Sequence, residues 1–238
     1  MKRLLKKDVI FWVVRIIMGI LFVGNFVSVF FVKDDSQQSR LIFNSAQSLM
    51  FLLASFIPSL IERKGQLEIP DFMEIIFIAF CICHFALGEI GNFFYKFKWW
   101  DSMLHTLSGS MVAILGFSII NSINANRNDQ MNLSPIMIAI FVVCFSLSIG
   151  VIWEILEFAI DGAFNSNMQR FRDTVTGDDL IGRAALVDTM KDLILDFIGA
   201  AVIAVVGYIS IRKDNRAFVD WTIRKREIII KESDETGF

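Results

Sequence analysis

The stretch QMNLSPIMIAIFVVCFSLSIGVIW, residues 130–153, contains no Asp, Glu, Lys or Arg over 24 positions. A helix needs about 20 apolar residues to cross the hydrocarbon core of a bilayer, so this stretch by itself predicts a transmembrane helix. Two more uncharged runs, residues 41–61 and 102–126, have lengths of 21 and 25. Continuous apolar runs favour helices over the alternating strands of a membrane barrel.

The composition of the whole chain agrees with a membrane location. Its 238 residues are 55% hydrophobic and 20% charged, with 24 Phe and a mean hydropathy of +0.57. A soluble domain of this length needs more polar cover for its surface. These values argue against a disordered chain, a coiled coil, a nucleic-acid-binding protein and a disulfide scaffold.

Three further apolar segments carry a few charges, and with them we predict an all-α bundle of six transmembrane helices. The first segment lacks a convincing cleavage site, so it is expected to remain as a helix. Residues 1–212 are predicted to form one membrane domain, and residues 213–238 a charged cytoplasmic tail. The predicted spans are 9–32, 41–61, 72–95, 102–126, 133–161 and 188–211.

The basic residues predict the orientation of the bundle. Of the 23 Lys and Arg residues, 14 fall on the side of the N-terminus, 7 on the opposite side and two within spans. Because basic loops stay on the cytoplasmic side, both termini are predicted to be cytoplasmic.

Acidic and His side chains gather in the extracytoplasmic halves of the last four predicted spans. A charge in the hydrocarbon region costs on the order of 3 kcal/mol, so each of these residues needs a reason. Helical spacing places most of them on shared faces, as for Asp101 and His105, which are four residues apart. We therefore predict an acidic, His-containing pocket between four helices. The two other stripes are Glu154, Glu157 and Asp161, and Asp188, Asp192 and Asp196.

Seven carboxylates cannot all be ionised close together in a low dielectric without protons or a cation. Carboxylate and imidazole ligands suit Zn or Mn, and carboxylates alone suit Mg. We predict one such divalent metal ion and no organic cofactor. The predicted metal ligands are Asp101, His105, Glu154 and Asp188, the predicted catalytic residues are Glu157 and Asp192, and the predicted supporting residues are His84, Asp161, Asp196 and Lys191.

Several of these residues also have a structural interpretation. Asp101 and Asp188 are each suited to capping the start of a helix, and a buried Asp or His in a membrane often makes only interhelical hydrogen bonds. Ser108–Ser110 predicts close helix packing. Arg15 is expected to pair with a carboxylate or to extend to the interface. The outer loop, residues 162–187, is interpreted either as a lid or as a solvated connection.

The ordered set of motifs resembles that of the YjdF-like bacterial membrane proteins, over roughly residues 80–205. A fainter resemblance reaches the VanZ-like family. The likeness implies a bacterial plasma-membrane protein with an acidic/His site, and it brings no settled reaction or substrate. The matching elements are Asp-x-x-x-His-x-x-x-Gly at 101–109, Glu-x-x-Glu at 154–157, Asp-x-x-x-Asp at 188–192 with Gly-Ala at 199–200, and His-x-x-x-Gly at 84–88.

Two main classes of function compete on this evidence. One is a metal-dependent enzyme acting on an envelope lipid or lipid-linked phosphate, with Glu157 as the base. The other is a cation- or proton-coupled transporter or binding protein, although no inverted repeat supports it. A noncatalytic scaffold with a structural ion is a third interpretation. The predicted partner is the lipid bilayer, and the oligomeric state is not predicted.

Overall fold

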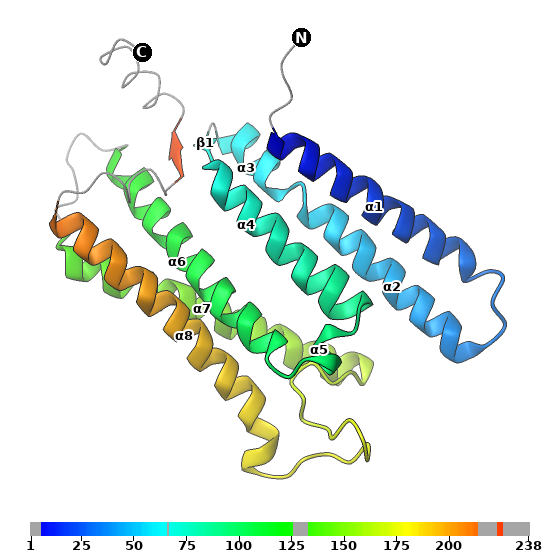
Figure 1. The fold of residues 1–238 in the computed structure, drawn as a ribbon. Helices are drawn as coiled ribbons and strands as arrows, with labels where there is room; N and C mark the ends of the chain where they lie inside the picture. The colour runs from blue at the N-terminus through cyan, green and yellow to red at the C-terminus, as the bar shows by residue number, and fades with distance from the viewer. Residues whose placement is uncertain (1–5, 66, 126–132, 214–222, 226–238) are drawn as a thin grey trace, which may run out of the picture. The chain divides into compact units, whose positions relative to one another are not determined.

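The computed structural model describes residues 6–65, 67–125, 133–213 and 223–225, and these are almost entirely helical. Two strands of two residues each, β1 (Leu67–Glu68) and β2 (Arg224–Lys225), pair antiparallel. The predicted all-α fold is therefore confirmed. The helices are α1 (Lys6–Ser28), α2 (Asp35–Ala54), α3 (Ile57–Gly65), α4 (Asp71–Cys81), the π-helix η1 (Ile82–Ile90), α5 (Phe93–Lys96), α6 (Trp100–Ala125), α7 (Pro135–Phe164) and α8 (Arg183–Arg212) (Figure 1).

Six helical stretches in the described part of the chain are long and apolar enough to cross a membrane, which confirms the predicted number. Their ends differ from the predicted ones by several residues: the second and sixth spans extend further at both ends, whereas the first, third and fourth end earlier. The orientation of the termini stays a prediction, and residues 214–222 and 226–238 of the predicted tail lie outside the described residues. The spans are Val9–Ser28, Asp35–Gly65, Asp71–Ile90, Trp100–Asn121, Pro135–Ala163 and Arg183–Arg212.

The second span is interrupted between α2 and α3. Proline has no backbone N–H, and its ring clashes with the carbonyl four residues before it. Pro58 therefore ends the regular hydrogen bonding at Ala54, where α2 stops, and α3 starts again at Ile57. The sequence analysis treated this span as one continuous helix.

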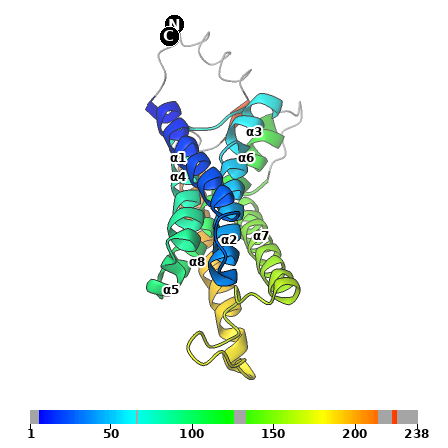
Figure 2. The ribbon, with the colours of Figure 1, turned by 90° about the vertical axis from the view of Figure 1, so that its right-hand side faces the viewer.

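The helices fall into two compact units, one formed by residues 1–100 with 224–238 and the other by residues 101–223. The single domain predicted for residues 1–212 stays a prediction. In the first unit, α1 lies along α2, and α2 also packs against η1 (Figures 1 and 2). Phe51, Ile78 and Cys81 are buried at the centre of this unit.

The π-helix η1 continues α4 with a wider turn, in which Gly91 N donates to Ala86 O over 2.9 Å. Such segments leave some carbonyl groups without their usual helical donor. Trp100 Nε1 donates to Cys83 O at 3.2 Å and supplies a donor from outside the helix.

The second unit consists mainly of α6, α7 and α8, which approach one another at glycines. A Cβ atom on Gly109 would overlap the backbone of Asp196, and one on Gly199 would overlap the carbonyl of Thr106. Ser146 Oγ of α7 donates to the carbonyl of Gly109 at 2.9 Å. The close packing predicted at Gly109 is thus confirmed, and it brings the polar residues of α8 against α6.

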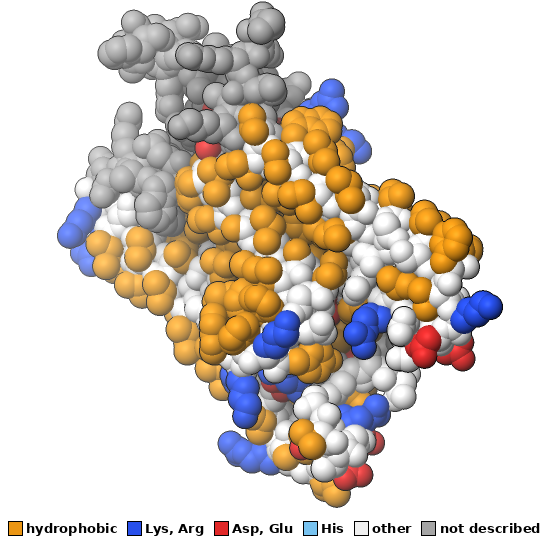
Figure 3. All heavy atoms as spheres, turned by 45° about the vertical axis from the view of Figure 1, so that its right-hand side comes forward, with side chains coloured by type: hydrophobic (Ala, Val, Ile, Leu, Met, Phe, Trp, Pro, Cys, Tyr) orange, Lys and Arg blue, Asp and Glu red, His pale blue; other side chains and the backbone are white. Residues whose placement is uncertain are grey.

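Hydrophobic side chains form a broad patch on the face seen in Figure 3. Trp12 on α1, Phe158 on α7 and Val202 on α8 are among the large exposed hydrophobic residues. A surface of this kind suits contact with lipid tails.

Candidate functional site

The geometric centre of the candidate site is a group of three side chains from α6 and α8. Asp101, His105 and Asp192 each offer one ligand atom, and these atoms lie within 4.8 Å of one another. Asp101 Oδ1 is 3.8 Å from His105 Nε2 across one helical turn. Ligand atoms that share one zinc ion lie about 2 Å from it and so up to about 4 Å apart, a spacing that small side-chain rotations would reach.

Asp196 holds the other side of the histidine ring. Its Oδ2 lies 3.4 Å from His105 Nδ1, and Ser108 Oγ lies 2.9 Å from its Oδ1. Asp196 is 2% exposed, and Gly150 of α7 leaves the room that its carboxylate fills. Asp196 therefore contacts the His105 ring at Nδ1, while Asp101 lies near Nε2; its predicted supporting role stays a prediction.

Glu154 of α7 is a buried carboxylate without an ordinary hydrogen bond. The Thr189 and Gln169 side chains lie close enough to interact with its carboxylate. Glu154 is 5% exposed, and neither of its carboxylate oxygens makes a hydrogen bond of ordinary geometry among the described residues. The same holds for Oδ1 of Asp192. Both carboxylates interact electrostatically with His105. Unsatisfied buried oxygens are costly and rare in native structures, so these oxygens are suited to binding a proton, a water or a cation.

Asp161 fastens the outer loop to the end of α7. Its carboxylate accepts hydrogen bonds from Ser166 Oγ at 2.6 Å, Met168 N at 2.7 Å and Gln169 N at 2.9 Å. The Gln169 amide then donates to Thr189 Oγ1 of α8 at 2.9 Å. This part of the loop is therefore folded against α7 and α8. That favours the interpretation of the loop as a structured lid and not as a solvated connection.

Arg170 follows directly and reaches the acidic cluster. Its Nη2 atom lies 3.4 Å from Asp101 Oδ2, and its Nε atom lies 3.8 Å from Asp188 Oδ2. Asp101 lies within the first turn of α6, whereas Asp188 lies five residues into α8, which begins at Arg183 after Gly182. Asp188 therefore does not cap its helix, and its carboxylate instead faces Arg170.

The far part of the loop makes its own local contacts. Asp173 Oδ1 accepts from Val175 N at 2.8 Å and from Thr176 N at 2.9 Å. These backbone donors favour the charged carboxylate and lower the pKa of Asp173 from its ordinary value. Arg172 Nε donates to Asp179 Oδ1 at 2.9 Å.

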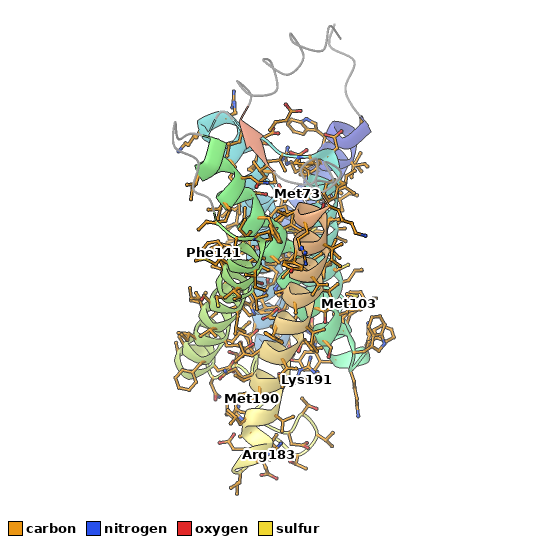
Figure 4. All side chains as sticks on the ribbon, turned by 90° about the vertical axis from the view of Figure 1, so that its left-hand side faces the viewer. Met73, Met103, Phe141, Arg183, Met190 and Lys191 are labelled. Carbon is orange, nitrogen blue, oxygen red and sulfur yellow. The ribbon has the colours of Figure 1, made fainter. Side chains whose placement is uncertain are left out.

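The remaining predicted residues lie around this centre or apart from it. Glu157 is buried and accepts a hydrogen bond from Trp153 Nε1 at 2.9 Å. Lys191 lies on α8 two turns beyond Arg183, half-buried and in electrostatic contact with Asp188 and Asp192 (Figure 4).

His84 belongs to the first unit and lies in an aromatic environment. Its ring centre is 6.2 Å from that of Phe80, 4.7 Å from that of Phe85 and 5.5 Å from that of Phe94. A role for His84 beside the residues of α6–α8 stays a prediction.

The sequence analysis did not assign Gln169 or Arg170 to the site. The signal was present, because Arg170 stands in a loop that joins two acidic stripes and so is near both in sequence. The loop folding that brings Arg170 to Asp101 depends on three hydrogen bonds to Asp161, which no local pattern reveals.

With these six apolar helices and their internal acidic cluster, the chain has the features of a multi-pass membrane protein. Residues 11–213 match the family described as "Predicted membrane protein (DUF2238)", and the chain belongs to this family. A Thermotoga maritima protein named "Uncharacterized protein" is 29% identical over 159 residues, which make up 67% of this chain and 73% of that protein. No solved structure matches the chain. The YjdF-like resemblance agrees with this membership, and the fainter VanZ-like one stays a prediction.

Proposed function

We propose that the second unit binds a divalent metal ion and that the protein is a metal-dependent enzyme of the bacterial plasma membrane. The observation that carries the proposal is the convergence of Asp101, His105 and Asp192, whose ligand atoms lie within 4.8 Å of one another. Carboxylate and imidazole donors from two helices suit Zn or Mn, and Mg is the choice if carboxylates dominate.

Glu154 is the proposed fourth ligand. Its two buried oxygens make no hydrogen bond of ordinary geometry among the described residues, and the Asp192 Oδ1 atom shares this property. Asp192 takes the ligand role that the sequence predicts for Asp188, because its ligand atom lies within 4.8 Å of those of Asp101 and His105.

A bound ion would act as a Lewis acid and would lower the pKa of a coordinated water. Glu157, buried and held by Trp153, is the proposed base that takes the proton of that water. The proposed substrate is an envelope lipid or lipid-linked phosphate, since the cluster lies on helices that cross the bilayer. The Lys and Arg distribution supports cytoplasmic termini and a site toward the extracytoplasmic side.

The metal content of detergent-purified protein tests the binding step. The wild type, His105→Ala, Glu154→Gln and the loop control Asp178→Asn are each equilibrated with Zn, Mn or Mg and dialysed. We expect about one tightly held ion per chain in the wild type and in the control, with loss in His105→Ala and weaker retention in Glu154→Gln. Absence of a stoichiometric ion from the wild type under all three conditions contradicts the proposal.

The reaction needs a separate measurement. Phosphate release from lipid phosphates in mixed micelles is expected for the metal-loaded wild type and not for Glu157→Gln. If the loaded protein hydrolyses nothing but moves cations or protons across proteoliposomes, the transporter interpretation replaces the enzyme. A reporter fused after Phe238 is expected to read cytoplasmic, and the opposite reading would invert the proposed placement of the site.

A further inference from the structure

Arg170 is a cation that the outer loop holds against two carboxylates of the acidic cluster. Its guanidinium lies 3.4 Å from Asp101, a proposed metal ligand, and 3.8 Å from Asp188. The Arg170 side chain is 29% exposed, whereas each aspartate side chain is 14% exposed. The positive charge thus lies at the rim of a cluster whose deeper members are almost fully buried.

The loop fixes this position through its backbone. Arg170 has a φ of +47°, a conformation that residues with a side chain adopt rarely and that needs support from the surrounding structure. The preceding residue, Gln169, provides that support through its N–H bond to Asp161 and its side-chain bond to Thr189. The backbone at Arg170 is therefore held in one position.

The contacts of Arg170 with Asp101 and Asp188 are longer than close ion pairs. Tight hydrogen bonds between guanidinium and carboxylate are about 2.7–2.9 Å long, and both contacts of Arg170 exceed that range. A divalent ion bound at Asp101 would neutralise the same carboxylate and weaken its hold on Arg170. The guanidinium would then stand next to the ion, as a second positive group for one anionic ligand.

We propose that Arg170 binds the phosphate group of the substrate next to the metal ion, so that the substrate is a phosphate ester. The planar guanidinium fork matches two oxygens of a phosphate group, and a metal ion commonly takes another. This inference rests on the proposed function, because it needs the metal site to place the phosphate. A lipid phosphate and a soluble phosphate ester share this chemistry.

Binding of phosphate to purified protein tests the role of Arg170. The probes are inorganic phosphate and dihexanoyl phosphatidic acid, each applied with and without the metal, and metal content is measured on the same samples. The variants are Arg170→Gln, Arg170→Lys and the matched control Arg183→Gln, an exposed arginine at the first turn of α8. We expect Arg170→Gln to keep its metal and to bind either probe at least about tenfold more weakly, with Arg183→Gln unchanged.

Arg170→Lys keeps the charge near Asp101 and Asp188 but lacks the fork, so it serves if Arg170→Gln does not fold. A fall in phosphate affinity in folded Arg170→Lys supports the inference, and wild-type affinity in either folded Arg170 variant overturns it, as does a wild type that binds neither probe. If the wild type holds no metal but binds phosphate, and Arg170→Gln loses that binding, the proposed function fails while the anion site stands. Tighter binding of the lipid probe than of inorganic phosphate supports a lipid substrate.

Discussion

Each unit of this protein carries charge within its membrane-spanning helices, but the two units treat that charge differently. In the first unit, Arg15 Nε donates to Ser55 Oγ at 3.1 Å, and its Nη2 atom donates to Ser55 O at 2.6 Å. The guanidinium also lies 4.1 Å from the ring centre of Phe56 and interacts electrostatically with buried Glu74. The positive charge of Arg15 is thus balanced by Glu74 and bound to neighbouring helices, which is typical of a charge that stabilises the fold.

The second unit carries an excess of negative charge. Its helices α6, α7 and α8 carry seven of the predicted site carboxylates, and the basic groups that contact or interact with members of this set are His105, Arg170 and Lys191. Several are satisfied by specific donors, as Asp161 and Asp196 are, but the carboxylate oxygens of Glu154 make no hydrogen bond of ordinary geometry among the described residues. Because such oxygens are costly unless something binds them, the difference between the units separates a charge that supports the fold from a cluster suited to a ligand.

The largest expected effect is on the interaction of Arg15 with Glu74 in the first unit. Arg15→Leu removes the charge that Glu74 faces and is expected to destabilise the protein by about 3 kcal/mol. Thermal unfolding in detergent measures this, with the exposed Arg40→Leu as the control. The double variant Arg15→Leu, Glu74→Leu is expected to recover much of the loss, and an unchanged melting temperature in Arg15→Leu would remove the basis of the comparison.

Neutralising a charge in the second unit should act in the opposite sense. Asp192→Asn keeps the shape of the side chain but relieves repulsion, so the metal-free protein is expected to be at least as stable as the wild type. Its metal affinity is expected to fall by at least about 100-fold, since even the loss of an outer partner costs up to that much. Unfolding and metal titration on the same samples measure both, with Asp178→Asn as the control. A strong loss of stability together with unchanged metal binding would make Asp192 a structural residue.

Gly150 tests how much the position of the Asp196 carboxylate matters in the second unit. A methyl group there would overlap the carboxylate of Asp196, so Gly150→Ala is expected to destabilise the protein by about 2 kcal/mol and to weaken metal binding through His105. Gly162 lies in the same helix with open space around it, so Gly162→Ala is the matched control and should be neutral or slightly stabilising. Equal behaviour of the two variants in unfolding and metal titration would show that the contact with Asp196 is unimportant.

The smallest expected effect is at Asp173, an acidic residue in the far part of the outer loop. Asp173→Ala removes the acceptor for Val175 N and Thr176 N, so these amides should exchange faster with solvent while global unfolding is unchanged. The pKa of Asp173 is lowered in the folded loop. The stabilisation is therefore present above the ordinary Asp pKa of about 4 and is lost as the pH falls through the lower, folded value. Hydrogen exchange at several pH values, corrected for intrinsic rates, measures this; wild-type protection in Asp173→Ala would exclude the turn.

Much of the fold could be predicted because uncharged length is a strong signal in a membrane protein. The break after Ala54 was missed, since Pro58 is the only local cue within an apolar run. The π-helix was missed as well, because its wider turn depends on packing and on the donor that Trp100 supplies. Ordinary periodicity carries no information on either.

The candidate site, like the fold, was predictable from the sequence only in part. The stripes of α6 and α8 follow from helical spacing, and the structure brings Asp101, His105 and Asp192 together. The interaction of Arg170 with Asp101 joins a loop to a helix 69 positions earlier, and it depends on the fold of the loop rather than on any repeat in the sequence. Spacing therefore predicts which residues of one helix share a face, and it does not predict what comes to meet them.

The aspartates of α8 have a consequence for how the chain is assembled in the membrane. Asp188, Asp192 and Asp196 lie in a helix that follows α6 and α7 in the chain, and each ionised carboxylate would cost on the order of 3 kcal/mol if it met lipid alone. His105 and Ser108 on α6 offer the partners of Asp196, and Gly109 and Gly150 leave the space that it occupies. We therefore expect stable insertion of α8 to depend on α6 and α7, which supply these partners and this space.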